Sequence, residues 1–130
     1  MSDAPPRIAG PEHRVTEAQL RRYADASGDR NPLHLDPAFA ATTPYGKPIA
    51  HGMLVLAFLS EMLTREFGKA WLCGGKLKTR FRAPVFPGDT VTAGGTLRAT
   101  SDGMAVYDVA VRNQGGAEVI TGEASIPLDS

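Results

Sequence analysis

The chain has 130 residues, of which 42% are hydrophobic and 22% are charged. This composition is typical of a soluble globular protein, and the length suits one domain better than two. Lysine plus arginine and aspartate plus glutamate each total 14, so the net charge gives no reason to expect nucleic acid as a partner. A membrane is not expected either, because the longest apolar run, 53–59, is far shorter than the ~20 residues of a spanning helix.

We therefore expect a single domain over residues 1–130, with a proline-rich start, 1–12, that is partly disordered. Cys73 is the single cysteine, which excludes an internal disulfide and a paired-cysteine metal site. The first residues lack the apolar stretch of a secretion signal. Together these features predict a cytoplasmic location.

The first predicted element is a helix over 17–26. Thr16 and Gln19 have the spacing of a capping box at its start, and Gly28 is a natural stop after its end. Its apolar residues recur at the helical spacing, so one face of this helix is expected to pack against the rest of the domain.

Residues 29–48 contain four prolines and do not have the pattern of a regular element. One helical turn is predicted over 37–42, with Asp36 as its N-cap and Pro37 at its first position. So long an irregular stretch within a compact domain usually has a function in binding or catalysis.

The second half predicts an antiparallel sheet around a buried helix. The helix is expected over 50–67, ended by Gly68, because 53–59 is apolar on every side. One long helix packed against one sheet gives an α+β fold, and the exposed sheet edges favour dimerisation. The predicted strands, separated by turns that contain glycine, are 71–84, 90–99, 104–112 and 117–127.

The segment after the first helix contains two side chains suited to proton transfer. Asp29 and His34 flank Asn31 and Pro32, and Pro32 prevents a helix from continuing while it holds Asn31 extended. A carboxylate and an imidazole on such a rigid segment can act on one water near neutral pH. Asn-Pro turns and loop histidines are also common without a chemical role, so the pair alone leaves both interpretations open.

The start of the second helix offers a site for negative charge. Free backbone N–H groups and the helix dipole stabilise an anion there, and Gly52 lets a ligand approach the backbone closely. A base, a proton donor and such an oxyanion site are what hydration of an α,β-unsaturated thioester requires. For the side chain of His51 we expect only a hydrogen bond to nearby backbone.

Three stretches of the sequence have a pattern specific to one protein family. They are YADASGDRNPLHLDPAFA over 23–40, PIAHGM over 48–53 and FRAPVFPGDTV over 81–91. Through them the chain resembles the MaoC-like, (R)-specific 2-enoyl-CoA hydratases, over most of 16–127. The G-D-x-N-P-L-H core is the most specific part. The short, proline-rich N-terminus departs from the pattern, so the family's first strand is expected to be abbreviated here.

The resemblance implies an α+β hotdog fold, in which a long antiparallel sheet wraps a central helix and a catalytic segment overhangs the sheet. It implies reversible hydration of trans-2-enoyl-CoA thioesters to (R)-3-hydroxyacyl-CoA. It further implies that the substrate is an acyl-CoA or an acyl-carrier-protein thioester, and that the protein is a homodimer or a higher homo-oligomer. No metal and no other cofactor is implied.

The resemblance also implies a role for each matching residue. Asp29 and His34 activate the water and protonate the α-carbon, and the N–H of Gly52 holds the thioester oxygen. Asn31 holds the segment or orients the pair. Ser60 either orients His34 or bonds to the backbone of its own helix.

A basic strand follows the second helix and has four alternating cations. The strand faces either solvent, which we favour for most of the four, or the phosphates of CoA or a carrier protein. Arg82 is the best candidate for a phosphate contact, because it lies in a family-like stretch. The four cations are Lys76, Lys78, Arg80 and Arg82.

Two other functions remain open. A hotdog thioesterase would use Glu61 on the central helix, where some such hydrolases keep their catalytic carboxylate. A non-catalytic chain would bind thioesters as the partner subunit of a hetero-oligomeric dehydratase. The G-D-x-N-P-L-H segment argues against the thioesterase, and the presence of both Asp29 and His34 argues against the non-catalytic chain.

Overall fold

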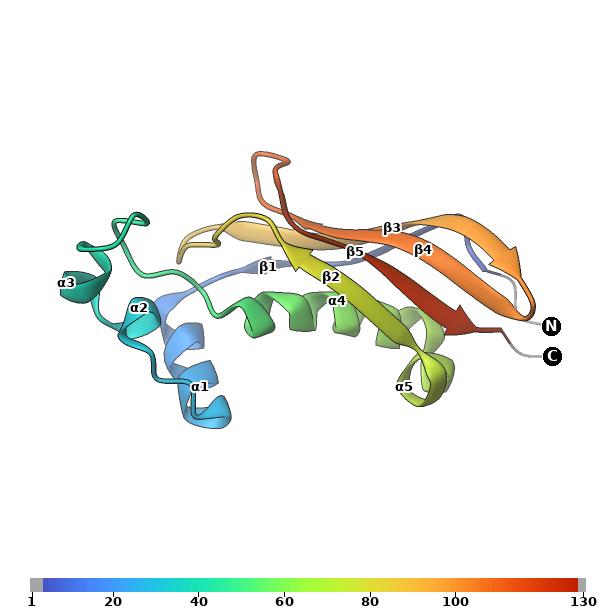
Figure 1. The fold of residues 1–130 in the computed structure, drawn as a ribbon, viewed down its shortest axis with the longest axis horizontal. Coiled ribbons are helices and arrows are strands. Elements are labelled where there is room, and N and C mark those ends of the chain that lie inside the picture. Colours follow the sequence, from blue (N-terminus) through green and yellow to red (C-terminus); the bar gives the residue numbers. More distant parts are fainter. Residues whose placement is uncertain (1–3, 129–130) are drawn as a thin grey trace.

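The computed structural model describes residues 4–128 of the chain. Its centre is one antiparallel sheet of five strands in the order β1-β3-β4-β5-β2, with helix α4, Gly52–Phe67, lying along one face (Figure 1). The strands are β1 Arg7–Arg14, β2 Lys76–Phe81, β3 Thr90–Ser101, β4 Met104–Arg112 and β5 Glu118–Pro127.

Helix α4 is the core of the domain, as its apolar sequence predicts. It packs against β1, β3 and β4, and each large side chain that it buries contributes on the order of 1.5–3 kcal/mol to the free energy of folding. No helix within residues 4–128 is long and apolar enough to cross a membrane. The buried side chains of α4 are Val55, Phe58, Leu59, Met62 and Leu63.

Three helices lie together beyond the N-terminal end of α4 (Figure 1). Helix α1, Glu17–Ser27, has the predicted capping box and ends at Gly28, whose φ of 81° suits glycine. The predicted single turn is α3, Pro37–Ala40, capped by Asp36. Helix α2, Pro32–Leu35, was not predicted, although Asn31 and Pro32 provide the same cap signal as the pair before α3.

The N-terminal strand is longer than the sequence predicts. Strand β1 pairs with β3 along its length, whereas residues 1–12 were expected to be partly disordered and the strand abbreviated. Pro11 is tolerated because β1 is an edge strand whose register shifts at this point. The Tyr107 hydroxyl donates to the carbonyl oxygen of Pro5 at 2.6 Å, which anchors the start of the strand. Residues 1–3 lie outside the described part of the chain.

The prediction of a strand from residue 71 is wrong. The chain forms helix α5, Lys69–Gly74, and β2 begins only at Lys76. Trp71 turns back onto α4, where its Nε1–H donates to the Ser60 hydroxyl at 3.3 Å. Gly75 makes this turn possible, because a Cβ at this position would lie 1.9 Å from the Trp71 ring.

Candidate active site

The turn α2 holds His34 in a fixed position. The Asn31 side chain caps this turn by accepting a hydrogen bond from the N–H of Leu33 at 3.0 Å, and Pro32 occupies the first helical position. The Asp29 carboxylate accepts from the N–H of Asn31 at 3.3 Å. Asn31 therefore connects Asp29 to the turn that carries His34.

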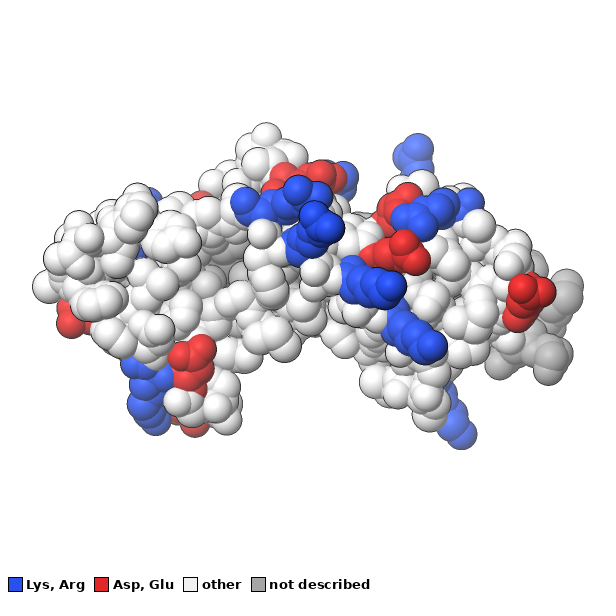
Figure 2. Space-filling view, viewed as in Figure 1, with Lys and Arg blue, Asp and Glu red and all other residues white. Residues whose placement is uncertain are grey.

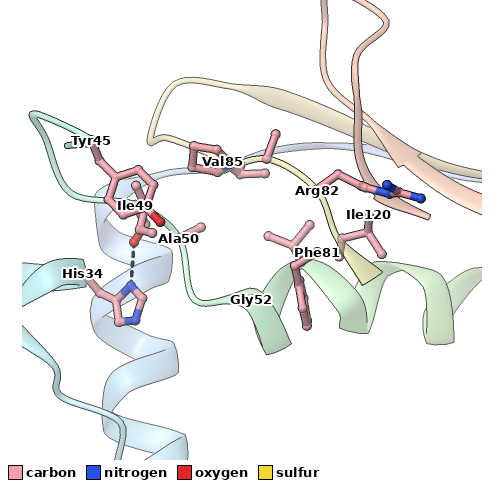
Figure 3. Close-up of a pocket in the computed structure, with 12 residues that line it drawn as sticks. His34, Tyr45, Ile49, Ala50, Gly52, Phe81, Arg82, Val85 and Ile120 are labelled. Atoms are coloured by element: carbon pink, nitrogen blue, oxygen red, sulfur yellow. Dashed lines mark hydrogen bonds between the residues drawn. The ribbon is translucent and has the colours of Figure 1, made fainter. Parts of the chain in front are cut away.

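The two nitrogens of His34 have different surroundings. Nδ1 lies 2.8 Å from the carbonyl oxygen of Ile49 (Figure 3). A carbonyl oxygen only accepts hydrogen bonds, so Nδ1 carries a hydrogen and donates it. In the neutral ring Nε2 is then unprotonated, and it is free to accept a proton from a water or to return one.

Asp29 and His34 lie close together, with His51 beside them. One potential ligand atom from each of these three side chains lies within 4.8 Å of the other two. Asp29 is exposed, whereas His34 is half-buried. A water molecule between the carboxylate and the imidazole can therefore contact both groups and still exchange with solvent.

Two histidines and a carboxylate are also a common ligand set for transition metals. Here, however, the rings of His34 and His51 are stacked, with centroids 3.9 Å apart and an angle of 25° between their planes. Metal ligation uses the in-plane lone pair of an imidazole, and the planes of stacked rings do not converge on one ion. This geometry fits a proton-transfer pair better than a metal site.

His51 is buried, with 1% of its surface exposed. Its Nε2 lies 3.0 Å from the carbonyl oxygen of Asp29, which agrees with the predicted bond to nearby backbone. Burial is the main cause that lowers the pKa of His51, and the nearby charge of His34 lowers it further. The hydrogen bond and the charge of Asp29 act in the opposite direction.

Gly52 is the first residue of α4, so its N–H has no acceptor within the helix. A Cβ at this position would lie 2.9 Å from Cε1 of Phe81. A side chain larger than glycine would therefore push the Phe81 ring from its place against the start of the helix (Figure 3). Phe81 remains 56% exposed and forms part of a cavity wall.

A cavity of about 380 Å³ lies at the start of α4. Its wall is mostly apolar, as expected for a site that binds an acyl chain. Three of the predicted site residues, His34, Gly52 and Arg82, line it. The other lining residues are Tyr45, Ile49, Ala50, Val55, Phe81, Ala83, Pro84, Val85 and Ile120.

Two residues considered from the sequence lie elsewhere. The Ser60 hydroxyl accepts a hydrogen bond from the Trp71 indole N–H, a partner that belongs to neither of the two alternatives considered for Ser60. Glu61 accepts from Nε2 of His13 at 2.6 Å, and the His13 ring stacks on Phe58. Neither Ser60 nor Glu61 lines the cavity that contains His34.

Figure 2 shows lysine and arginine side chains in a row that follows β2. A surface groove is lined by Lys78, Arg80, Arg82 and Arg98. Two carboxylates on β4 and β5 neutralise Arg98. The other three cations, which we call the cationic row, form no ion pair with any residue of the described part, 4–128.

Arg82 joins the cationic row to the cavity, since it lines both the groove and the cavity. Its Nε–H donates to the hydroxyl of Thr121 at 3.0 Å, which uses one of its five N–H donors. The remaining donors are available to an anion that enters along the groove.

Known proteins share both the sequence and the fold. The sequence matches the family described as MaoC like domain over residues 5–119. It is 42% identical over 118 residues to the (R)-specific enoyl-CoA hydratase of Aeromonas caviae, which covers 88% of this chain and 87% of that protein. It is 38% identical over 99 residues to 3-hydroxyacyl-thioester dehydratase Z of Mycobacterium tuberculosis, which covers 73% of this chain and 62% of that protein.

Solved structures agree with these relatives. The (R)-hydratase from A. caviae involved in PHA biosynthesis superimposes with a TM-score of 0.82 at 38% identity, over 95% of this chain and 94% of that one. An R-hydratase from Pseudomonas aeruginosa in the unliganded form gives a TM-score of 0.78 at 30% identity, over 95% and 90%. The expected hotdog fold is confirmed, and the chain belongs to the MaoC-like family of enoyl-thioester hydratases and dehydratases.

Proposed function

We propose that this protein hydrates trans-2-enoyl-CoA thioesters to (R)-3-hydroxyacyl-CoA, with Asp29 and His34 as the catalytic pair. The observation that supports these roles most directly is the 2.8 Å hydrogen bond between His34 and Ile49. It leaves Nε2 of His34 as the free nitrogen on a side chain that lines the cavity. The identity to the A. caviae enzyme supports the reaction and its (R) stereochemistry.

The proposed reaction requires two proton transfers. A water between Asp29 and His34 loses a proton to one of them as its oxygen bonds to the β-carbon. The electrons of the double bond move toward the thioester, and the pair delivers the proton taken from the water to the α-carbon, so a bare Nε2 and an ionised carboxylate are sufficient at the start. No net proton is gained or lost, so the same pair catalyses the reverse dehydration.

Negative charge develops on the thioester oxygen during the addition. The N–H of Gly52 has no acceptor within α4, and it lies at the end of the helix where the dipole favours an anion. We assign this N–H to the thioester oxygen, because a donor that is already oriented stabilises the enolate more strongly than it stabilises the neutral substrate.

The cationic row supports CoA as the carrier of the acyl group. CoA has a diphosphate and a 3′-phosphate beyond its pantetheine arm, and three cations without carboxylate partners attract such an anion. Arg82 is assigned to a phosphate because it lies where the groove meets the cavity.

We also propose a homodimer in the cytoplasm. Strands β1 and β2 are sheet edges, and Phe81 and Met53 are exposed apolar side chains near the start of α4. Both features favour pairing with a second copy. The free, exposed thiol of Cys73 suits a reducing compartment.

The test is loss of the conjugated-thioester ultraviolet absorbance when the purified protein meets crotonyl-CoA or a longer 2-enoyl-CoA. Asp29→Asn is measured beside the wild type. Asp25→Asn is the matched control, because this exposed carboxylate lies on α1 and pairs with Arg30. We expect rapid loss of absorbance in wild type and control, slow loss in Asp29→Asn, and (R)-3-hydroxyacyl-CoA as product.

Each part of the proposal has an outcome that would contradict it. Release of free thiol in place of hydration would show a thioesterase. Equal rates in wild type and Asp29→Asn would remove the assigned role of Asp29. Activity that appears only with a co-purified second chain would show a partner subunit.

A further inference from the structure

His51 occupies a position between the two proposed catalytic residues. Its Nε2 contacts the backbone carbonyl of Asp29 at 3.0 Å, and its ring stacks on that of His34 with centroids 3.9 Å apart. The ring of Tyr23, on α1, lies against it at 4.8 Å. One rigid, buried ring therefore contacts both members of the pair, which come from opposite sides of Pro32 in the sequence.

Helix capping does not explain the side chain of His51. The residue is at the N-cap position of α4, but its side chain accepts no hydrogen bond from the helix. Among residues 4–128, Nδ1 has no hydrogen-bond partner, although a buried polar atom without one is destabilising. A serine, threonine or aspartate would cap the helix better. In place of a cap bond, the imidazole of His51 makes contacts to Asp29 and His34.

We propose that His51 is a positioning residue for the hydration reaction, which holds Asp29 and His34 at the separation that one water requires. The inference rests on the proposed hydratase function. His51 acts on Asp29 through a hydrogen bond and on His34 through ring stacking. Its contacts are to the two members of the pair, and it does not line the cavity, so its removal is expected to misplace the pair without removing a reacting group.

The protonation of His51 follows from these contacts. The carbonyl oxygen of Asp29 only accepts, so Nε2 carries the hydrogen and Nδ1 of the neutral ring is bare. A second hydrogen on Nδ1 would have no described acceptor, and the resulting charge would lie against His34. Burial and the charge of His34 both lower the pKa of His51. A neutral His51 leaves His34 free to gain a proton during the reaction.

The first test uses the wild-type protein and needs no activity. The chain contains only three histidines, so nitrogen-15 NMR of their rings separates His51 from His13 and His34. We expect the Nε2–H tautomer of His51, neutral throughout the working pH range. A hydrogen on Nδ1 alone would show that the Asp29 contact does not exist, and would overturn the proposal whether or not the protein is a hydratase.

The second test compares three variants. His51→Phe retains a ring for stacking but loses the donor, His51→Gln retains a donor but loses the ring, and His51→Ala loses both. We expect kcat to fall ~10- to 100-fold in the alanine variant, because a small misplacement of reacting groups has effects of this size. The other two are expected to lose less, and KM is expected to stay near the wild-type value in all three.

The control is His13→Phe, which removes a histidine whose ring lies against Phe58, away from the cavity. Its kcat is expected to equal that of wild type. Rates are expressed per folded protein, measured by circular dichroism and thermal unfolding. Wild-type kcat in folded His51→Ala, or a rise in KM with unchanged kcat, would overturn the proposal. If the wild-type protein is inactive, the hydratase function is wrong. The NMR result then still shows whether the hydrogen bond between His51 and Asp29 exists.

Discussion

The Nδ1 atom of His34 and the carbonyl oxygen of Ile49 are joined by a 2.8 Å hydrogen bond across 15 positions of the chain. This bond connects the turn α2 to the segment that leads into α4. It has two consequences. It holds the imidazole at the wall of the cavity, and it selects Nε2 as the nitrogen that exchanges protons.

The substitution His34→Asn removes the proton-exchanging nitrogen but can keep the hydrogen bond to Ile49, so it tests the two consequences separately. The asparagine amide can still donate a hydrogen bond near the position of Nδ1, but it has no group in place of Nε2. We expect kcat with 2-enoyl-CoA to fall on the order of 10²–10⁴-fold, as for loss of a general acid–base group. The midpoint of thermal unfolding is expected to remain close to that of wild type. A kcat near the wild-type value would contradict the role of His34.

Gly52→Ala tests the close approach between the helix start and Phe81. The new methyl group would lie 2.9 Å from the Phe81 ring, so the ring has to shift at the wall of the cavity that it lines. We expect kcat/KM to fall ~10-fold or more while stability is unchanged or slightly raised, because alanine favours a helix more than glycine does.

The double variant Gly52→Ala/Phe81→Ala checks this steric explanation. If the methyl group acts by displacing the ring, its effect on kcat/KM is smaller in the Phe81→Ala background, with a coupling of about 0.5–3 kcal/mol. Strictly additive effects of the two substitutions would show that the methyl group acts in another way, for example by blocking access to the Gly52 N–H.

Local signals in the sequence located the helix ends that bound the candidate catalytic segment, and tertiary contacts explain what these signals missed. The caps at Thr16 and Asp36 and the stops at Gly28 and Gly68 are properties of adjacent residues, so they are readable without a structure. The residues next to Trp71 also fit a strand. What makes this segment helical is a contact with another element, the hydrogen bond from Trp71 to Ser60 on α4, and adjacent residues do not reveal it. The same contact gives Ser60 a partner that its position in the sequence does not indicate.

The position of His51 could not be predicted for a similar reason. In sequence it is a histidine at a helix start, and its partner Asp29 lies 22 positions earlier. The stacking on His34 depends on the path of the segment 29–49 beyond the start of α4, and this path is fixed by long-range bonds such as the one between His34 and Ile49. Residue types and spacing therefore single out Asp29 and His34 as candidates but do not show the ring that contacts both of them.

Glu61→Gln distinguishes the hydratase from a thioesterase. Glu61 is hydrogen-bonded to His13 and does not line the cavity, so we expect wild-type hydration by this variant. Its partly exposed pair with His13 contributes at most about 1 kcal/mol to stability. Ultraviolet absorbance measures hydration, and a thiol reagent measures CoA release. Loss of a CoA-releasing activity in Glu61→Gln would restore the thioesterase as the leading function.

Arg82→Ala tests the assignment of CoA to the cationic row. Arg82 lies where the groove meets the cavity and has no ion-pair partner among residues 4–128. We expect KM for crotonyl-CoA to rise about three- to tenfold, the effect of losing roughly 1 kcal/mol from an exposed charge contact. The kcat is expected to change little, because the phosphates are remote from the reacting carbons.

Crotonyl-pantetheine and Arg112→Ala provide the controls for this experiment. Crotonyl-pantetheine has the same thioester and arm but no phosphate, so its KM is expected to be equal in wild type and Arg82→Ala. Arg112 is an exposed arginine paired with Glu118, and it lines neither the cavity nor the groove. Added salt is expected to raise the wild-type KM for crotonyl-CoA, because salt screens exposed charges. The difference in KM between wild type and Arg82→Ala is therefore expected to become smaller. An equal rise in KM for both substrates would place Arg82 near the thioester and contradict a phosphate contact.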